Sequence, residues 1–149
     1  MRSIDAVITW VDGSDKEYKK KIDKHLTSST NYKKQYLQAN EIEYCVKSIL
    51  KFAPFVRRIF IVTDNQKPSF KGLEDLIVSN KVKIVDHKEI FKGYEKYLPT
   101  FNIRSIDAVL HRIEDLSEMF VYFNDDVFLI NKISEEDWFL ENKAVLMGK

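Results

Sequence analysis

The stretch "RIFIVTD", residues 58–64, decides the fold class of this chain. Four consecutive apolar residues, mostly β-branched, lead into an acidic residue. A short continuous apolar run bounded by polar residues is typical of a strand that is buried on both faces. Three further runs have this character, namely "IDAVITW" (4–10), "VKIVD" (82–86) and "MFVYFN" (119–124). We therefore predict four buried strands.

Helical patterns lie between and after these strands. In "NEIEYCVKSILKFA" (40–53) the apolar residues follow the offsets of one helix face, Asn40 resembles an N-cap, and Pro54 ends the pattern. An apolar stripe predicts a second helix in "SIDAVLHRIEDL" (105–116), and a weaker pattern predicts a third in "SEEDWFLEN" (134–142). Strands alternating with helices indicate an α/β fold with a mainly parallel sheet flanked by helices, Rossmann-like in character. At 149 residues, without Pro/Gly-rich linkers, the chain is expected to be a single domain over 1–149.

Composition argues against several classes of protein. There are 24 basic and 23 acidic residues, and this near balance is not that of a nucleic-acid binder. The basic run "KEYKKKIDK" (16–24) is interpreted as a solvated helix face. The single cysteine, Cys45, excludes an intrachain disulfide and is expected to pack in the core. No transmembrane helix or signal peptide is recognisable, so we expect a cytoplasmic protein.

Acidic residues follow all four predicted strands. They are Asp12, Asp64, Asp86 and the pair Asp125 and Asp126. In open α/β sheets ligands bind outside the carboxyl ends of the strands, which meet at one edge. Asp and Asn also favour the turns that follow strands, and this explains one or two of the acids without a function. Acids after all four strands predict a ligand site at that edge.

Two of these acids, Asp125 and Asp126, interrupt the apolar run "MFVYFNDDVFLI" (119–130). Burying a carboxylate without a partner is costly, so something must stabilise them. Successive strand residues point to opposite faces, so both acids can meet one ion only if the chain turns after Asn124. Mg²⁺ commonly binds one or two carboxylates together with substrate phosphates, which predicts a divalent-cation site here. The absence of a glycine-rich nucleotide loop argues against a dinucleotide or P-loop enzyme.

Several motifs together resemble the Stealth family of hexose-1-phosphate transferases. They are "IDAVITWVDGSD" (4–15), "NEIEYCVKSILKFAPFVRRIFIVTDNQKPSF" (40–70), "VKIVDHKEIF" (82–91), "YLPTFN" (97–102) and "LHRIEDLSEMFVYFNDDVFL" (110–129). The family includes bacterial capsular polysaccharide phosphotransferases and the catalytic subunit of the lysosomal-enzyme N-acetylglucosamine-1-phosphotransferase. Its members usually continue beyond this length, so the chain is expected to match their N-terminal part. Ile103 and Asp107 stand where members usually carry Ser and Glu.

The resemblance implies a fold like that of nucleotide-sugar transferases, a UDP-sugar donor such as UDP-N-acetylglucosamine, and a saccharide acceptor. An acceptor hydroxyl would attack the β-phosphorus, release UMP and leave a phosphodiester, in capsular or exopolysaccharide synthesis. Asp125 and Asp126 would bind Mg²⁺ or Mn²⁺. The implied catalytic residues are His111, Arg112, Asp12 and Asn102. The implied donor-binding residues are Trp10, Val11, Gly13, Asp15, Asp64, Asn65 and Gln66.

Other interpretations stay open. A metal-dependent glycosyltransferase would use the same donor but release UDP, and an incomplete module would bind the donor without turnover. His111 and Arg112 could have structural roles, Trp10 could be a core residue, and the polar loop residues could be ordinary turn residues. We interpret His87 as structural. The resemblance also allows a peripheral association with polysaccharide-synthesis machinery.

Overall fold

The computed structural model describes residues 3–26 and 39–145, and its centre is a four-stranded parallel sheet. The strands are β1 (Ile4–Thr9), β2 (Ile59–Thr63), β3 (Val82–Asp86) and β4 (Met119–Asn124). All four predicted strands are confirmed. Their order, β3-β2-β1-β4, places β1 between two parallel neighbours and β3 and β4 at opposite edges. The predicted α/β class is therefore confirmed, and the order is that of the first four strands of a Rossmann fold.

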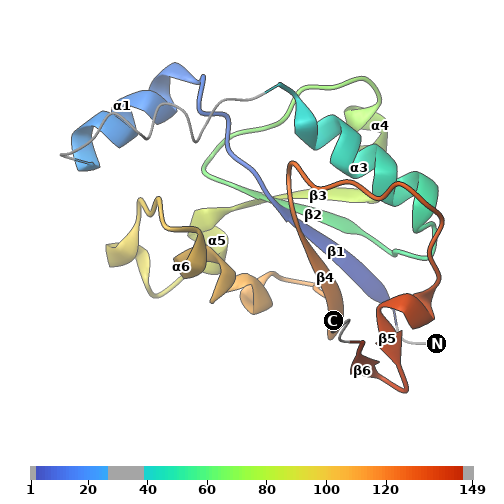
Figure 1. Ribbon diagram of the computed structural model, residues 1–149. Coiled ribbons are helices and arrows are strands. Elements are labelled where there is room, and N and C mark those ends of the chain that lie inside the picture. Colours follow the sequence, from blue (N-terminus) through green and yellow to red (C-terminus); the bar gives the residue numbers. More distant parts are fainter. Residues whose placement is uncertain (1–2, 27–38, 146–149) are drawn as a thin grey trace, which may run out of the picture.

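Helices cover both faces of this sheet (Figure 1). Over one face lie α3 (Glu41–Phe52) and α4 (Leu73–Val78), and over the other lie α5 (His87–Ile90) and α6 (Ile103–Asp107). Helix α3 confirms the prediction for residues 40–53 and begins after its N-cap, Asn40. No helix in the described ranges has both the length and the apolar character needed to cross a bilayer.

Two apolar cores hold these layers together. Because successive strand residues alternate between faces, Ile61 packs with Ile49 of α3, whereas its neighbour Phe60 packs on the other side with Ile90 of α5 and Ile106 of α6. All but Ile106 have no exposed surface, and Ile106 is 6% exposed. Burying such side chains contributes about 1.5–3 kcal/mol each. The sheet is therefore a rigid platform for the loops at its ends.

Helix α1 (Lys16–His25) follows β1 and contains the basic run. Its lysines are exposed apart from the half-buried Lys21, and Tyr18 is its only buried residue. The interpretation of this run as a solvated helix face is confirmed. Cys45, on α3, has no exposed surface, so its expected place in the core is also confirmed.

The predicted helix at 105–116 is replaced by two short elements, α6 and the 3-10 turn η2 (Leu110–Arg112). The apolar residues Ile106, Leu110 and Ile113 still share one core. Spacings of three and four residues fit a 3-10 turn as well as an α-helix, and the amides of Arg112 and Ile113 bond to carbonyls three residues back. Periodicity alone could not separate the two.

The predicted helix at 134–142 is wrong. Ser134 and Asp137 do form a capping box, but it begins only the 3-10 turn η3 (Glu135–Asp137). A hairpin of β5 (Phe139–Leu140) and β6 (Lys143–Ala144) follows. Its two loop residues, Glu141 and Asn142, have φ values of 50° and 64°, and positive φ at both positions is what a tight type I′ hairpin requires.

The buried carboxylate of Asp5 ties the amino ends of the strands together. It accepts hydrogen bonds from Arg57 Nε at 2.9 Å, from Arg57 Nη2 at 2.6 Å and from the Ser117 amide at 2.7 Å. Burial by itself raises the pKa of Asp5, but the bonds from Arg57 and Ser117 outweigh it and hold the pKa below its ordinary value. Asp5 therefore stays ionised and joins β1 to the chain entering β2 and β4.

Candidate functional site

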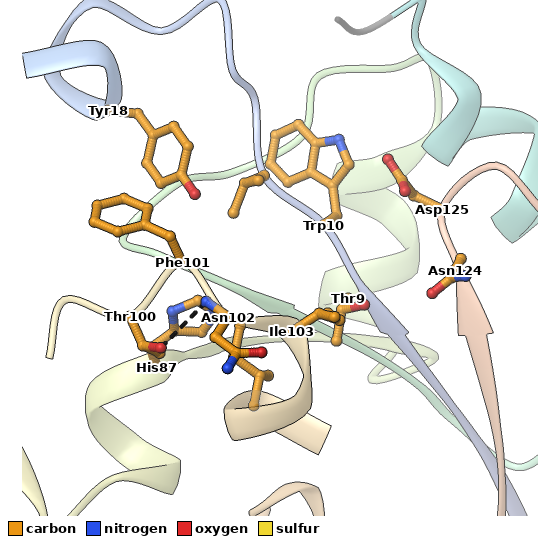
Figure 2. Close-up of a pocket in the computed structure, with 12 residues that line it drawn as sticks. Thr9, Trp10, Tyr18, His87, Thr100, Phe101, Asn102, Ile103, Asn124 and Asp125 are labelled. Carbon is orange, nitrogen blue, oxygen red and sulfur yellow. Dashed lines mark hydrogen bonds between the residues drawn. The ribbon is translucent and has the colours of Figure 1, made fainter. Parts of the chain in front are cut away.

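A cavity of about 470 Å³ lies at the carboxyl ends of β1 and β4 (Figure 2). Residues from the end of β1, α1, the start of α5, the approach to α6 and the end of β4 line it. The chain runs from β1 to β2 on one side and places β4 on the other, so this edge is the topological switch point of the sheet. Ligands of open α/β sheets bind there, and the volume is in the range of ligand pockets.

Aromatic side chains form one wall of the cavity. Trp10 and Val11 follow β1, Tyr18 comes from α1, and Phe101 precedes α6. The rings of Tyr18 and Phe101 meet edge to face, with centroids 5.8 Å apart. Trp10 is 8% exposed and also packs in the core beneath α3. Trp10 is therefore a core residue whose surface also lines the cavity, and its role in donor binding stays a prediction.

The opposite wall is polar and comes from the end of β4. Tyr122 donates a hydrogen bond to Asn124 Oδ1 at 3.0 Å, and its hydroxyl is 2.8 Å from Thr9 Oγ1 on β1. The chain turns after Asn124, since the amide of Val127 bonds to the Asn124 carbonyl at 3.1 Å. Asp125 lies half-buried in the cavity wall beside this turn.

The second acid of the pair, Asp126, is exposed and is not among the lining residues. Both carboxylates nevertheless act on the same buried group, Cys45. Burial, together with the negative charges of Asp125 and Asp126, raises the pKa of Cys45 to about 12. The Cys45 thiol lies 3.7 Å from the Asn124 carbonyl, to which it donates. The two acids therefore concentrate negative charge at the end of β4.

The chemistry of these donors fits a divalent cation. In the described part of the chain, no group of three or more His, Cys, Asp or Glu side chains is placed to hold a metal. Zinc-type sites need such a group, whereas Mg²⁺ commonly uses one or two carboxylates and takes its other ligands from phosphates and water. Asp125, with Asp126 next to it, supplies this kind of donor set.

The side-chain amide of Gln66, in the loop after β2, holds the loop after β1 in place. Gln66 Oε1 accepts from the Asp12 amide at 2.9 Å, and Gln66 Nε2 donates to the Asp12 carbonyl at 3.0 Å. The Asp12 carboxylate accepts from the amide and hydroxyl of Ser14, at 2.7 and 2.6 Å. Gly13 is buried in this turn. These contacts fix the backbone that carries Trp10 and Val11.

Two further acids fix helix α1. Asp15 is its N-cap and accepts from the Tyr18 amide at 2.7 Å. Asp64, after β2, receives both hydrogen bonds of Lys21 Nζ at 3.0 Å. Asn65 is exposed, with a φ of 53°. Of the residues implied to bind the donor, the structure therefore brings Trp10 and Val11 to the cavity. Gly13, Asp15, Asp64, Asn65 and Gln66 belong to the loops and helix around it.

Asn102, implied to be catalytic, lines the cavity at the start of α6. It is the N-cap of that helix, and its Oδ1 accepts from the Arg104 amide at 3.0 Å. Its own amide donates to Thr100 Oγ1 at 3.3 Å. Ile103, which stands where the family usually has Ser, also lines the cavity and is 45% exposed. The departure from the family pattern therefore places an apolar surface at this point of the wall.

The other residues implied to be catalytic lie away from the cavity lining. Asp12 is used in the turn after β1, and His111 and Arg112 are on η2. Arg112 Nη2 donates to the Lys92 carbonyl at 2.6 Å, and its guanidinium lies 4.9 Å from the ring centroid of Tyr94. His111 is exposed. Their catalytic roles stay predictions.

Several lining residues were not predicted from the sequence. They are Thr9, Tyr18, His87, Thr100, Phe101, Ile103, Ile106 and Asn124. Tyr18 follows the capping residue Asp15 by three positions, and His87 directly follows β3, so helix-cap spacing and strand ends were available signals. Thr9 and Asn124 are the last residues of β1 and β4 and carry the same strand-end signal. The remaining four come from α6 and the loop before it, which have no such signal.

The chain matches two conserved regions of Stealth proteins, region 1 over residues 2–29 and region 2 over residues 35–147. The capsular polysaccharide phosphotransferase fcs1 of Haemophilus influenzae is 43% identical over 145 residues, which cover 93% of this chain and 38% of that protein. The receptor polysaccharide phosphotransferase WefC of Streptococcus oralis is 38% identical over 148 residues, covering 95% of this chain and 43% of that protein. The chain thus spans less than half the length of these relatives. With region 2 alone matching more than half of it, the chain belongs to the Stealth family.

Proposed function

We propose that this chain is the donor-binding part of a metal-dependent polysaccharide phosphotransferase. The reaction would move a hexose-1-phosphate, such as N-acetylglucosamine-1-phosphate, from a UDP-sugar to a saccharide hydroxyl in capsular or exopolysaccharide synthesis. The observation that carries the proposal is the cavity at the switch point, which joins an aromatic wall to the carboxylate of Asp125. The names of the relatives, which are polysaccharide phosphotransferases, support the reaction type.

The charge of the cavity lining indicates that a divalent cation helps to bind the diphosphate of the donor. Among the described residues that line the wall, Asp125 is the only one with a formal charge at neutral pH, and none is Lys or Arg. A diphosphate next to a carboxylate would be repelled unless a divalent cation joined them. When bound, Mg²⁺ or Mn²⁺ would neutralise charge on the transferring phosphoryl group. The uracil ring would pack against the aromatic wall that Trp10, Tyr18 and Phe101 form.

The reaction itself needs little covalent chemistry from the protein. The oxygen of the acceptor hydroxyl forms a bond to the β-phosphorus, the bond from that phosphorus to the bridging oxygen breaks, and UMP leaves with the bridging oxygen. The hydroxyl proton passes to a base. Phosphoryl transfer of this kind depends mainly on positioning and on stabilising charge. In this scheme Asn102 orients the reacting groups. His111 and Arg112 contact an acceptor that approaches along η2, and His111 takes the proton of the acceptor hydroxyl.

The proposal is tested by thermal unfolding of the purified chain with UDP-N-acetylglucosamine, with and without Mn²⁺. At about 100 times its dissociation constant the ligand should add roughly 2.7 kcal/mol, which is a shift on the order of 5–10 °C. We expect this shift to require Mn²⁺ and to be lost in Asp125→Asn. The exposed acid Asp75 on α4 provides a matched control, because Asp75→Asn should bind like wild type. The absence of any shift in the folded wild-type chain would contradict the proposal.

Product analysis separates the competing functions. Incubation with donor, Mn²⁺ and an oligosaccharide acceptor should release UMP. Release of UDP would instead show a glycosyltransferase. Donor binding without any nucleotide product would show that this chain binds the donor but does not catalyse transfer by itself.

A further inference from the structure

The imidazole of His87 lies in the wall of the cavity, at the far edge of the sheet from Asp125. His87 follows β3, and Asp125 follows β4, the two edge strands. Figure 2 shows the His87 ring beside Thr100 and Asn102. The side chain is 3% exposed, and all three residues line the cavity. This end of the cavity therefore offers uncharged hydrogen-bonding groups, while the carboxylate lies at the other end.

The backbone around His87 is fixed by a capping box. Asp86 Oδ1 accepts from the Lys88 amide at 2.8 Å, and Glu89 Oε1 accepts from the Asp86 amide at 2.8 Å. The His87 ring takes part in none of these bonds, and its Nδ1 is buried without a hydrogen-bond partner among the described residues. Buried polar atoms without a partner are uncommon in folded proteins, because the lost hydration is not replaced. A ligand in the cavity would supply the missing partner.

The charge of His87 limits what that ligand can be. Burial lowers the pKa of His87, and Lys21 lowers it too, against the opposing effect of the carboxylates of Asp64 and Asp86. The ring is therefore neutral at physiological pH and provides no positive charge for a phosphate. A neutral imidazole nitrogen pairs well with a hydroxyl group in either tautomer, because a hydroxyl both donates and accepts.

We propose that His87 is a specificity-determining residue that hydrogen-bonds a hydroxyl of the donor's hexose. The inference rests on the proposed function, which places the diphosphate near Asp125 and the uracil on the aromatic wall. The hexose is then the part of the donor left for the uncharged groups at His87, Thr100 and Asn102. This replaces the interpretation of His87 as a structural residue with a binding role.

The test compares two ligands that share uridine diphosphate, one with the hexose and one without it: UDP-N-acetylglucosamine and UDP, each titrated with Mn²⁺ present. In His87→Phe, which keeps the size of the ring, we expect about a tenfold loss of affinity for UDP-N-acetylglucosamine and none for UDP. His87→Asn, which keeps a polar group near the position of Nδ1, should recover part of the loss. An equal loss for both ligands, or no loss for either, would overturn the proposal.

A second measurement leaves His87 itself unchanged. In the wild-type chain labelled with ¹⁵N-histidine, the His87 ring signals should move with UDP-N-acetylglucosamine and not with UDP. His25→Asn and His111→Asn identify the signals of the other two histidines, so the remaining signals belong to His87. Nucleotide binding with unmoved His87 signals would refute only this inference. A wild-type chain that binds neither nucleotide would refute the proposed function, and this inference with it.

Discussion

The substitution Asp5→Asn separates the stability of this sheet from its ligand site. Asp5 has no exposed surface, and its carboxylate accepts three hydrogen bonds, two from Arg57 and one from Ser117. An asparagine has the same shape but turns an amide NH₂ toward at least one of these donors. The substitution also leaves the Arg57 guanidinium without its ionic partner. The cavity lies at the other end of β1, so the change should not reach it.

The loss of stability expected for Asp5→Asn depends on how deeply each partner of the ion pair, Asp5 and Arg57, is buried. Removing one partner of a fully buried ion pair typically costs about 3–5 kcal/mol. Arg57 is 40% exposed, so water can partly solvate the guanidinium after the substitution and the cost is lower. We expect Asp5→Asn to lower the free energy of unfolding by about 2–3 kcal/mol. For a chain of this length that corresponds to a fall in Tm of about 5–10 °C.

The assay is urea unfolding at neutral pH, followed by circular dichroism, with Asp23→Asn on α1 as an exposed control. The control should stay within about 0.5 kcal/mol of wild type. Donor affinity at a temperature where both variants are folded should equal that of wild type. A loss below about 1 kcal/mol in Asp5→Asn would refute the assignment of the buried pair as the tie between the strands.

The same pair predicts an acid limit to stability. The pKa of Asp5 is lower in the folded chain than in the unfolded chain, so its ionisation stabilises the fold fully above the unfolded pKa, about 3.9. That contribution is lost as the pH falls through the lower folded pKa. The difference in stability between wild type and Asp5→Asn should therefore shrink below about pH 4. A difference that stays constant down to pH 2.5 would show that the charge of Asp5 does not matter.

Three shorter predictions follow from single contacts. Gln66→Leu removes both hydrogen bonds to the Asp12 backbone. Titration should show donor affinity falling about threefold to tenfold, while Tm falls by only a few degrees. Unchanged affinity would mean that the loop after β1 holds its place without Gln66. The Cys45 thiol, with no exposed surface and a pKa of about 12, should react with a disulfide reagent only on unfolding, and rapid labelling of the native chain would contradict this. Tyr122→Phe removes the hydroxyl that donates to Asn124, and denaturant unfolding should show a loss of about 1 kcal/mol, whereas a gain would argue against this bond.

Some parts of the fold could be predicted because the local sequence pattern matches the burial of the residues in the folded chain. The four strands are continuous apolar runs, and residues such as Ile8 and Val62 are indeed fully buried on both sides of the sheet. The end of the chain shows the limit. There, Trp138 packs against Phe55 and Phe123, with ring centroids 5.4 and 6.0 Å away. Those contacts are distant in sequence, and they favour a turn and a hairpin where the local pattern indicated a helix.

The acids at the strand ends located the site, although most of them do not line it. Asp12, Asp64 and Asp86 each have a partner near their own strand end, namely the Ser14 hydroxyl, the Lys21 ammonium on α1 and the Lys88 amide on α5. Turn and capping chemistry accounts for Asp12 and Asp86, the one or two allowed from the sequence, and an ion pair with Lys21 accounts for Asp64. Asp125 is the strand-end acid that lines the cavity.

The position of the cavity follows from strand order, which the sequence alone did not reveal. β1 lies between β2 and β4. The chain therefore leaves the end of β1 toward one face of the sheet, while β4 ends beside β1. The space between the ends of β1 and β4 is open to a ligand. The acids of the neighbouring loops keep that space in shape by fixing the turn and helix that carry Trp10 and Tyr18. Substituting them should therefore weaken donor binding by loosening the aromatic wall. Substituting Asp125 should abolish the Mn²⁺-dependent binding of the donor altogether. A single titration series, with and without Mn²⁺, distinguishes these two kinds of effect.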